Sequence, residues 1–133
     1  MTRPRLVVLD ASHGNEDTRR NVRRELDADL LEFDVTAGDL PATGEAFPDV
    51  DGVVVTGSRA SVYWDEPWIS SVKDWAATAI DRGLPVLGIC WGHQLLADVL
   101  GGEVAALEAD ELGYVTIERT TDQDPLFEGI DRR

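Results

Sequence analysis

Short apolar runs alternate with segments of helical periodicity along this chain. The runs predict strands buried in a parallel sheet, and they cover residues 5–10, 50–56 and 84–89. Residues 31–35 instead alternate between apolar and polar side chains, which is typical of a half-exposed strand near a sheet edge. Two more strands are expected over residues 103–107 and 114–119, as an antiparallel extension of the sheet.

Three segments between the strands carry apolar residues at helical spacing. The first helix is expected to begin at Asn15, a capping residue, and to continue through Leu30. Its apolar stripe consists of Val22, Leu26 and Leu30. The second helix is expected to be capped by Asp65, and its buried face consists of Ile69, Val72, Trp75, Ala76, Ala79 and Ile80. The third helix is expected over residues 94–100, with Gly101 ending it.

This alternation of strands and helices predicts an α/β fold, in which helices cover both faces of a parallel sheet. No repeat or linker divides the 133 residues, so residues 1–133 are expected to form one domain. Ligand sites in such sheets lie at the carboxyl ends of the strands. Gly57 and Cys90 each follow an expected strand, so both are expected to face one pocket.

The turn before the third helix has the pattern of a nucleophile elbow. Cys90 stands between Gly88 and Gly92, the small–x–nucleophile–x–small spacing, with cysteine in place of serine. At the start of a helix, the helix dipole and free N–H groups favour a thiolate and can hold a developing oxyanion. The alternative interpretation is that Cys90 is a small apolar side chain in a turn that requires glycine anyway.

The chain is strongly acidic, with 26 Asp and Glu against 12 Lys and Arg and a net charge of −14. This charge argues against a surface that neutralises nucleic-acid phosphates, and it favours a salt-adapted, halophilic source. The single cysteine rules out an internal disulfide, which is typical of the reducing cytosol. No segment is apolar over a membrane-spanning length. We therefore expect a cytoplasmic protein that binds neither nucleic acid nor membrane.

Several motifs resemble those of the class I, triad-type glutamine amidotransferases. Residues 88–94, Gly-Ile-Cys-Trp-Gly-His-Gln, are similar to the family's nucleophile signature, and residues 53–58 resemble the strand and glycine-rich loop of its oxyanion site. Residues 111–114 and 124–127 resemble two further family segments. The resemblance covers residues 5–130 and is strongest to the GMP-synthase-type subgroup. It implies a flavodoxin-like three-layer sandwich with a mostly parallel sheet.

The resemblance also implies a reaction. Cys90 would attack the side-chain amide of glutamine, release ammonia and form a glutamyl thioester that water cleaves. The N–H of Trp91 and one N–H from Gly57 or Ser58 would hold the oxyanion, and Gln94 would contact the substrate. Many relatives have a second glycine where Ser58 stands, which leaves open which amide points inward. No cofactor or metal is implied, and the ammonia would pass to a synthetase partner, here one that makes GMP.

The family's general base has no match in this sequence. That base is the histidine of a His-x-Glu pair well downstream of the elbow, whereas the two histidines here are His13 and His93. His93 lies in the first turn after Cys90, where the family has His or Met, and His13 remains as a substitute candidate in the loop after the first strand. We therefore expect a domain that is incomplete at its C-terminus and hydrolyses glutamine slowly or not at all.

Other interpretations stay open at this point. A degenerate, non-catalytic form would equally lack the His-x-Glu pair, and it would act as a binding or regulatory module. A peptidase that cleaves γ-glutamyl bonds would share both the elbow and the fold. An α/β-hydrolase that uses cysteine would leave the loop at Gly57 without a role.

Overall fold

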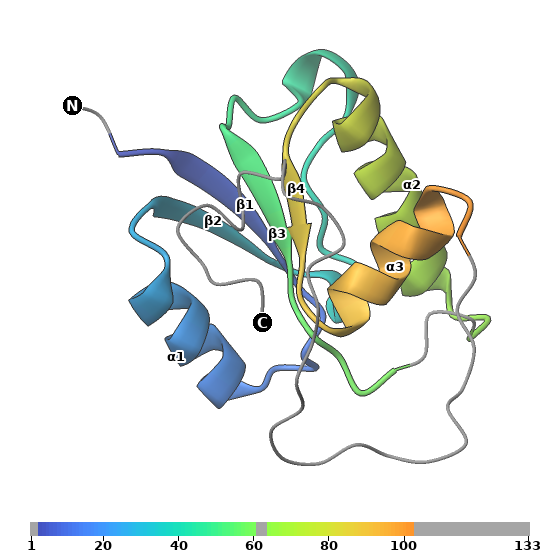
Figure 1. Cartoon of the computed structure of the whole chain (residues 1–133), viewed down its shortest axis with the longest axis horizontal. Coiled ribbons are helices and arrows are strands. Elements are labelled where there is room, and N and C mark those ends of the chain that lie inside the picture. Colours follow the sequence, from blue (N-terminus) through green and yellow to red (C-terminus); the bar gives the residue numbers. More distant parts are fainter. Residues whose placement is uncertain (1–2, 61–63, 103–133) are drawn as a thin grey trace, which may run out of the picture.

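Four parallel strands form the centre of the protein (Figure 1). The computed structural model describes residues 3–60 and 64–102. The strands are β1 (Arg5–Asp10), β2 (Asp29–Asp34), β3 (Gly52–Val55) and β4 (Val86–Gly88). Their order in the sheet is β2-β1-β3-β4, and every neighbouring pair is parallel. The predicted α/β fold with a parallel sheet is therefore confirmed, and the order is that of flavodoxin-like folds.

The strand order reverses between β1 and β3. The chain passes from β1 to β2 on one side and then returns to place β3 on the other side of β1. Val8 at the centre of β1 accordingly pairs with Glu32 of β2 and with Val54 of β3. In open parallel sheets such a reversal opens a crevice at the carboxyl ends of the two strands, because the loops that follow them leave toward opposite faces.

Three α-helices cover the two faces of this sheet, as Figure 1 shows. They are α1 (Glu16–Glu25), α2 (Pro67–Asp81) and α3 (Trp91–Val99). Helices α2 and α3 pack together on one face, and α1 lies on the other, so the layers expected of the sandwich are present. Two short 3-10 helices, Val35–Ala37 and Gly44–Ala46, lie in the connection between β2 and β3.

The hydrophobic core lies between the sheet and the pair α2 and α3. Alternate residues of β1 and β3 point into it, and they are Val7, Leu9, Val53 and Val55. The predicted buried face of α2 is confirmed for Ile69, Val72, Trp75, Ala76 and Ala79, whereas Ile80 is half-buried. Leu95 of α3 is fully buried in the same core. Burial of this apolar face fixes α3, and with it the turn that precedes α3.

The first helix is shorter than predicted. Asn15 caps it as expected, since its side chain accepts a hydrogen bond from the Thr18 N–H at 3.0 Å. The helix ends at Glu25, however, and the prediction that it continues through Leu30 is wrong. The Asp29 N–H donates to the Pro4 carbonyl at 2.8 Å and starts β2, so a contact distant in sequence overrides the continuing apolar period.

Other predicted boundaries also need correction. Asp65 does not cap α2: Glu66 occupies the N-cap position without a side-chain hydrogen bond, and Pro67 is the first helical residue. The last strand was expected to be buried, yet Leu87 is 48% exposed and the following Ile89 is 44% exposed. The strands predicted over 103–107 and 114–119 lie outside the described residues.

Candidate active site

Cys90 occupies the turn between β4 and α3, where it is the N-cap of the helix. Its backbone has φ 52° and ψ −108°, and a positive φ is uncommon for any residue other than glycine. The residue is exposed and its thiol is free. The strained turn therefore presents the thiol at the surface, at the start of a helix, as a nucleophile elbow does.

The two glycines of the elbow are required by close backbone approach. A Cβ on Gly88 would overlap the backbone of Gly92 one turn into α3, and a Cβ on Gly92 would overlap the backbone of Val55 in β3. Helix α3 thus leaves the sheet at a distance that only glycine permits at these positions. The predicted helix start at residue 94 is wrong, because α3 begins at Trp91, directly after the cysteine.

The first backbone N–H groups of α3 point back toward the elbow. The Gly92 N–H donates to the Ile89 carbonyl at 2.9 Å, and the Gln94 N–H donates to the Cys90 carbonyl at 3.1 Å. The Trp91 N–H belongs to the first residue of the helix, and helix geometry gives it no intrahelical acceptor. This N–H is the donor nearest in sequence to the thiol that an oxyanion could use.

The loop after β3 lies against the elbow. A Cβ on Gly57 would stand 3.5 Å from the Cβ of Cys90, so these two residues are neighbours across the ends of β3 and β4. Thr56 fixes this loop, because its hydroxyl accepts from the Ala11 N–H at 2.8 Å and donates to the Gly57 carbonyl at 3.1 Å. The structure thus brings Gly57 and Cys90 together, as their positions after two strands predict.

A cavity of about 330 Å³ opens beside the thiol, between the ends of the strands and α1. Its walls are mostly apolar, and they consist of Thr18, Asn21, Val22, Glu25, Leu26, Thr56, Gly57, Ile89 and Cys90. The sequence analysis missed the contribution of α1, because it assigned the stripe of Val22 and Leu26 to a packed core. In the structure both side chains are half-buried, and they line the cavity instead.

The remaining predicted site residues are dispersed around the elbow. The Trp91 side chain is buried away from the thiol and packs against Trp68, with ring centroids 5.4 Å apart, so only its backbone can serve the site. Gln94 is exposed on α3, and it does not line the cavity that contains Cys90. Ser58 lines a neighbouring cavity, and its hydroxyl accepts a hydrogen bond from the Ala60 N–H at 3.1 Å.

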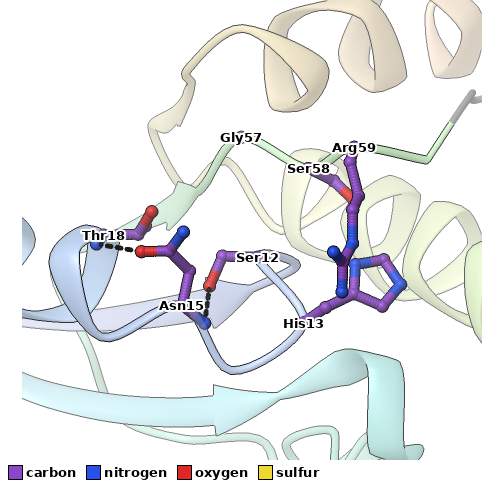
Figure 2. Close-up of a pocket in the computed structure, with 7 residues that line it drawn as sticks. All are labelled: Ser12, His13, Asn15, Thr18, Gly57, Ser58 and Arg59. Carbon is purple, nitrogen blue, oxygen red and sulfur yellow. Dashed lines mark hydrogen bonds between the residues drawn. The ribbon is translucent and has the colours of Figure 1, made fainter.

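That neighbouring cavity has a volume of about 370 Å³ and lies between the loops that follow β1 and β3 (Figure 2). The residues around it are Ser12, His13, Asn15, Thr18, Gly57, Ser58 and Arg59. His13, the substitute candidate for the general base, lines this cavity and not the one that holds Cys90. His93 is exposed on α3. Neither histidine therefore shares a described cavity with the thiol.

A buried ion pair supports the loop after β1. Asp10 is 4% exposed and accepts a hydrogen bond from the Arg19 side chain at 2.7 Å and another from the Ser12 N–H at 2.9 Å. Burial by itself would raise the pKa of Asp10, but the bonds from Arg19 and Ser12 and the Arg19 charge outweigh burial and hold this pKa below its ordinary value. The same contact raises the pKa of Arg19. The pair joins α1 to the end of β1.

The described part of the chain contains no group of three or more His, Cys, Asp and Glu side chains arranged to hold a metal ion. No helix within residues 3–60 and 64–102 combines the length and apolar character needed to cross a bilayer.

Comparison with protein families gives a match over almost the entire chain. The model of the glutamine amidotransferase class-I family matches residues 7–133. The GMP synthase (glutamine-hydrolyzing) of Aeropyrum pernix is 38% identical over 130 residues, and that of Thermomicrobium roseum is 37% identical over 132 residues. These alignments cover 98% and 96% of this chain but only 24% and 23% of the two synthases. The chain thus spans about a quarter of the length of these relatives.

Solved structures show the same fold. A GMP synthase subunit protein from Thermoplasma acidophilum superposes with a TM-score of 0.64 at 21% identity, covering 99% of this chain and 62% of that one. A glutamine amido transferase from Methylobacillus flagellatus superposes with a TM-score of 0.57 at 25% identity, covering 85% of this chain and 45% of that one.

Proposed function

We propose that Cys90 is the nucleophile of a glutaminase, on the premise that this chain belongs to the glutamine amidotransferase class-I family. One observation carries the proposal: the only cysteine of the chain has a positive φ at the start of α3, with Gly57 packed against it. Strain at a single non-glycine residue is retained where the surrounding structure fixes it, and functional sites are where such residues gather.

The proposed reaction is an acyl transfer through the thiol. The Cys90 thiolate attacks the carbonyl carbon of the glutamine side-chain amide and forms a C–S bond, and the carbonyl oxygen becomes an oxyanion. Collapse of this intermediate breaks the C–N bond, and the nitrogen leaves as ammonia after taking up a proton. Water then attacks the glutamyl thioester, which releases glutamate and restores the thiol.

The oxyanion is proposed to lie between two backbone donors. Trp91 contributes the first N–H of α3, and the loop after β3 contributes an N–H from Gly57 or Ser58. The contact between the loop and the elbow supports this assignment, since it places Gly57 beside Cys90. The proposed contact of Gln94 with the substrate rests on the family resemblance, and its place on α3, one turn after Cys90, is compatible with it.

The proposal assigns no general base. His13 and His93 are the two histidines of the chain, and the described cavities place neither beside the thiol. Proton transfer by a positioned base typically contributes 10²–10⁴-fold to an enzymatic rate. We therefore propose that this chain forms the covalent bond at Cys90 more readily than it completes a catalytic cycle.

A synthetase is the proposed consumer of the ammonia. The GMP synthases that this chain resembles are named for glutamine hydrolysis, and the chain matches about a quarter of their length. We propose that the released ammonia passes to a GMP-forming synthetase, as part of the same protein or as a partner.

The test is covalent labelling of Cys90 by a diazoketone analogue of L-glutamine, followed by intact-protein mass spectrometry. We expect saturable addition of one label to the wild type and none to Cys90→Ser, which has no thiol. The D-enantiomer of the analogue controls for recognition, and iodoacetamide controls for access to the thiol. Equal labelling rates with both enantiomers would contradict a glutamine site, even if the thiol is reactive.

The peptidase alternative is tested with the same protein. Incubation with γ-glutamyl dipeptides and with glutamine, followed by mass spectrometry of the intact protein, shows which substrate acylates Cys90. We expect a glutamyl adduct from glutamine. An adduct that forms only from the dipeptides would favour the peptidase.

A further inference from the structure

The cavity between the loops after β1 and β3 lies at the reversal of strand order (Figure 2). Open parallel sheets bind ligands in the crevice at this position. Cys90 follows β4 and lies one strand away from the reversal, so the proposed chemistry of the thiol leaves this crevice unused. The two cavities share only Thr18 and Gly57 among the residues that line them.

The charge of the cavity is opposite to that of the chain. The chain contains 26 acidic residues, yet the seven residues that line this cavity include an arginine, a histidine and no carboxylate. The nearby carboxylates have partners of their own: Asp10 pairs with Arg19, and Asp17 pairs with Arg20, each at 2.7 Å. Arg59 has no ion-pair partner within residues 3–60 and 64–102. In Figure 2 its side chain extends from the loop after β3 toward His13.

Several hydrogen-bond donors remain available inside the cavity. Asn15 uses its side-chain oxygen to cap α1, which leaves its amide NH₂ group free to donate. The Ser58 oxygen accepts from the Ala60 N–H, so its O–H can point elsewhere. Arg59 presents a guanidinium group with a fork of N–H donors, the geometry that carboxylates and phosphates accept in pairs. Donors therefore come from both loops and face one space.

We propose that this cavity binds an oxyanion group, a phosphate or a carboxylate, of a small molecule. Arg59 provides the charge, and Asn15 and Ser58 provide the neutral donors. The start of α1 is not the source of attraction, because Asn15 already occupies the Thr18 N–H and the first turn carries Glu16 and Asp17. This site is separate from the thiol, and it does not depend on the proposed glutaminase activity.

The two histidines make the site observable in the intact chain. The ring protons of His13 and His93 give two sets of NMR signals, which His13→Gln and His93→Gln assign. We expect titration with inorganic phosphate or acetate, at constant ionic strength set with sodium chloride, to shift the His13 signals along a saturation curve. His93 lies on the exposed surface of α3 and should not follow that curve. Equal shifts of both histidines, or equal shifts with chloride alone, would overturn the proposal.

Arg59→Gln is the decisive variant, since it removes the charge and keeps much of the side chain. Loss of a charge-assisted contact predicts a dissociation constant raised by about tenfold or more. Arg5→Gln is the matched control, because Arg5 is exposed at the opposite end of β1. Unchanged binding in Arg59→Gln, or the same loss in both variants, would refute the site.

Two further arms identify the ligand and separate this proposal from the glutaminase. Saturation by phosphate at lower concentration than acetate assigns a phosphate-bearing ligand, and the reverse order assigns a carboxylate. Cys90→Ser should bind the anion as the wild type does, whereas it cannot take up the glutamine-analogue label. Loss of anion binding in Cys90→Ser would contradict a site separate from the thiol.

Discussion

The two faces of the sheet are held by different forces. On one face, α2 buries five apolar residues against β1 and β3. On the other face, α1 contains no buried residue, and ion pairs join it to the sheet. Arg19 pairs with Asp10 of β1, and Arg23 pairs with Glu32 of β2. The first face is closed by packing, and the second is bridged by charge.

This difference explains where the cavity beside Cys90 lies. A face closed by packing holds the backbone of α3 and the elbow in one position, but it leaves no volume for a ligand. Ion pairs can hold a helix away from the sheet, and the half-buried Val22 then lines an open space of about 330 Å³. The rigid face positions the nucleophile, and the open face leaves room beside it.

Removing a large side chain from the packed face should have the largest effect on stability. Trp75 is 3% exposed and stacks on Phe47, with ring centroids 5.1 Å apart. We expect Trp75→Ala to lower the free energy of unfolding by about 3–5 kcal/mol, through lost burial and the cavity left behind. Urea denaturation followed by circular dichroism measures this change.

Trp64→Ala is the control, because Trp64 is 49% exposed and the same truncation removes little buried surface. Its effect should stay within about 1 kcal/mol. Similar losses in the two variants would show that burial on the face of α2 does not dominate stability.

Asp10→Asn should have the next largest effect. The substitution removes the carboxylate that accepts from Arg19 and from the Ser12 N–H, where the α1 face meets β1. Hydrogen bonds to charged groups contribute about 1.5–3 kcal/mol, and we expect a loss in free energy of unfolding within that range. Urea denaturation at neutral pH tests this, and no measurable loss would mean that α1 is held by other contacts.

The same residue predicts a dependence of stability on pH. The pKa of Asp10 is lower in the folded protein than its ordinary value of 3.8, so the unfolded chain takes up the proton first as pH falls. Its stabilising contribution is complete above pH 3.8 and is lost as pH falls through the folded pKa. Asp10→Asn should remove that part of the acid dependence, and an unchanged difference between the two proteins across pH 5 to 3 would contradict the assignment.

The sequence predicts the features that local chemistry determines. The apolar run of Val53, Val54 and Val55 indicated a buried strand, and Asn15 indicated the start of α1; both are confirmed. The glycines on either side of Cys90 indicated a tight turn from strand to helix, and the backbone contacts of Gly88 and Gly92 give its physical reason.

Features that depend on distant contacts were not predicted. The end of α1 is decided by a bond from Asp29 to Pro4, which no local pattern shows, since Leu30 fits the helical period equally well. The part played by Val22 in lining the cavity depends on how far α1 lies from the sheet. The approach of Arg59 and His13 depends on the strand order, which brings the loops after β1 and β3 together.

A matched pair of substitutions compares the two faces directly. Val72 is fully buried on α2, and Val22 is half-buried on α1, beside an open cavity. Val72→Ala should lower the free energy of unfolding by about 2 kcal/mol, and Val22→Ala by less than about 1 kcal/mol. Thermal or urea denaturation resolves the difference. Equal losses would mean that α1 is packed as closely as α2, and the account of the open face would fail.

The smallest effect is expected at the outer ion pair of α1. Arg23 donates two hydrogen bonds to one oxygen of Glu32, each within 3.1 Å, but its side chain is 60% exposed and water competes with the contact. Arg19→Gln and Arg23→Gln make the same change one helical turn apart. We expect Arg19→Gln to destabilise the protein more, because it leaves the buried Asp10 without its charged partner. The effect of Arg23→Gln should largely disappear near 1 M salt, where exposed charges are screened, and the effect of Arg19→Gln should persist. Two equal effects that salt removes together would mean that both pairs behave as surface contacts, and α1 would then have no fixed attachment beside the cavity.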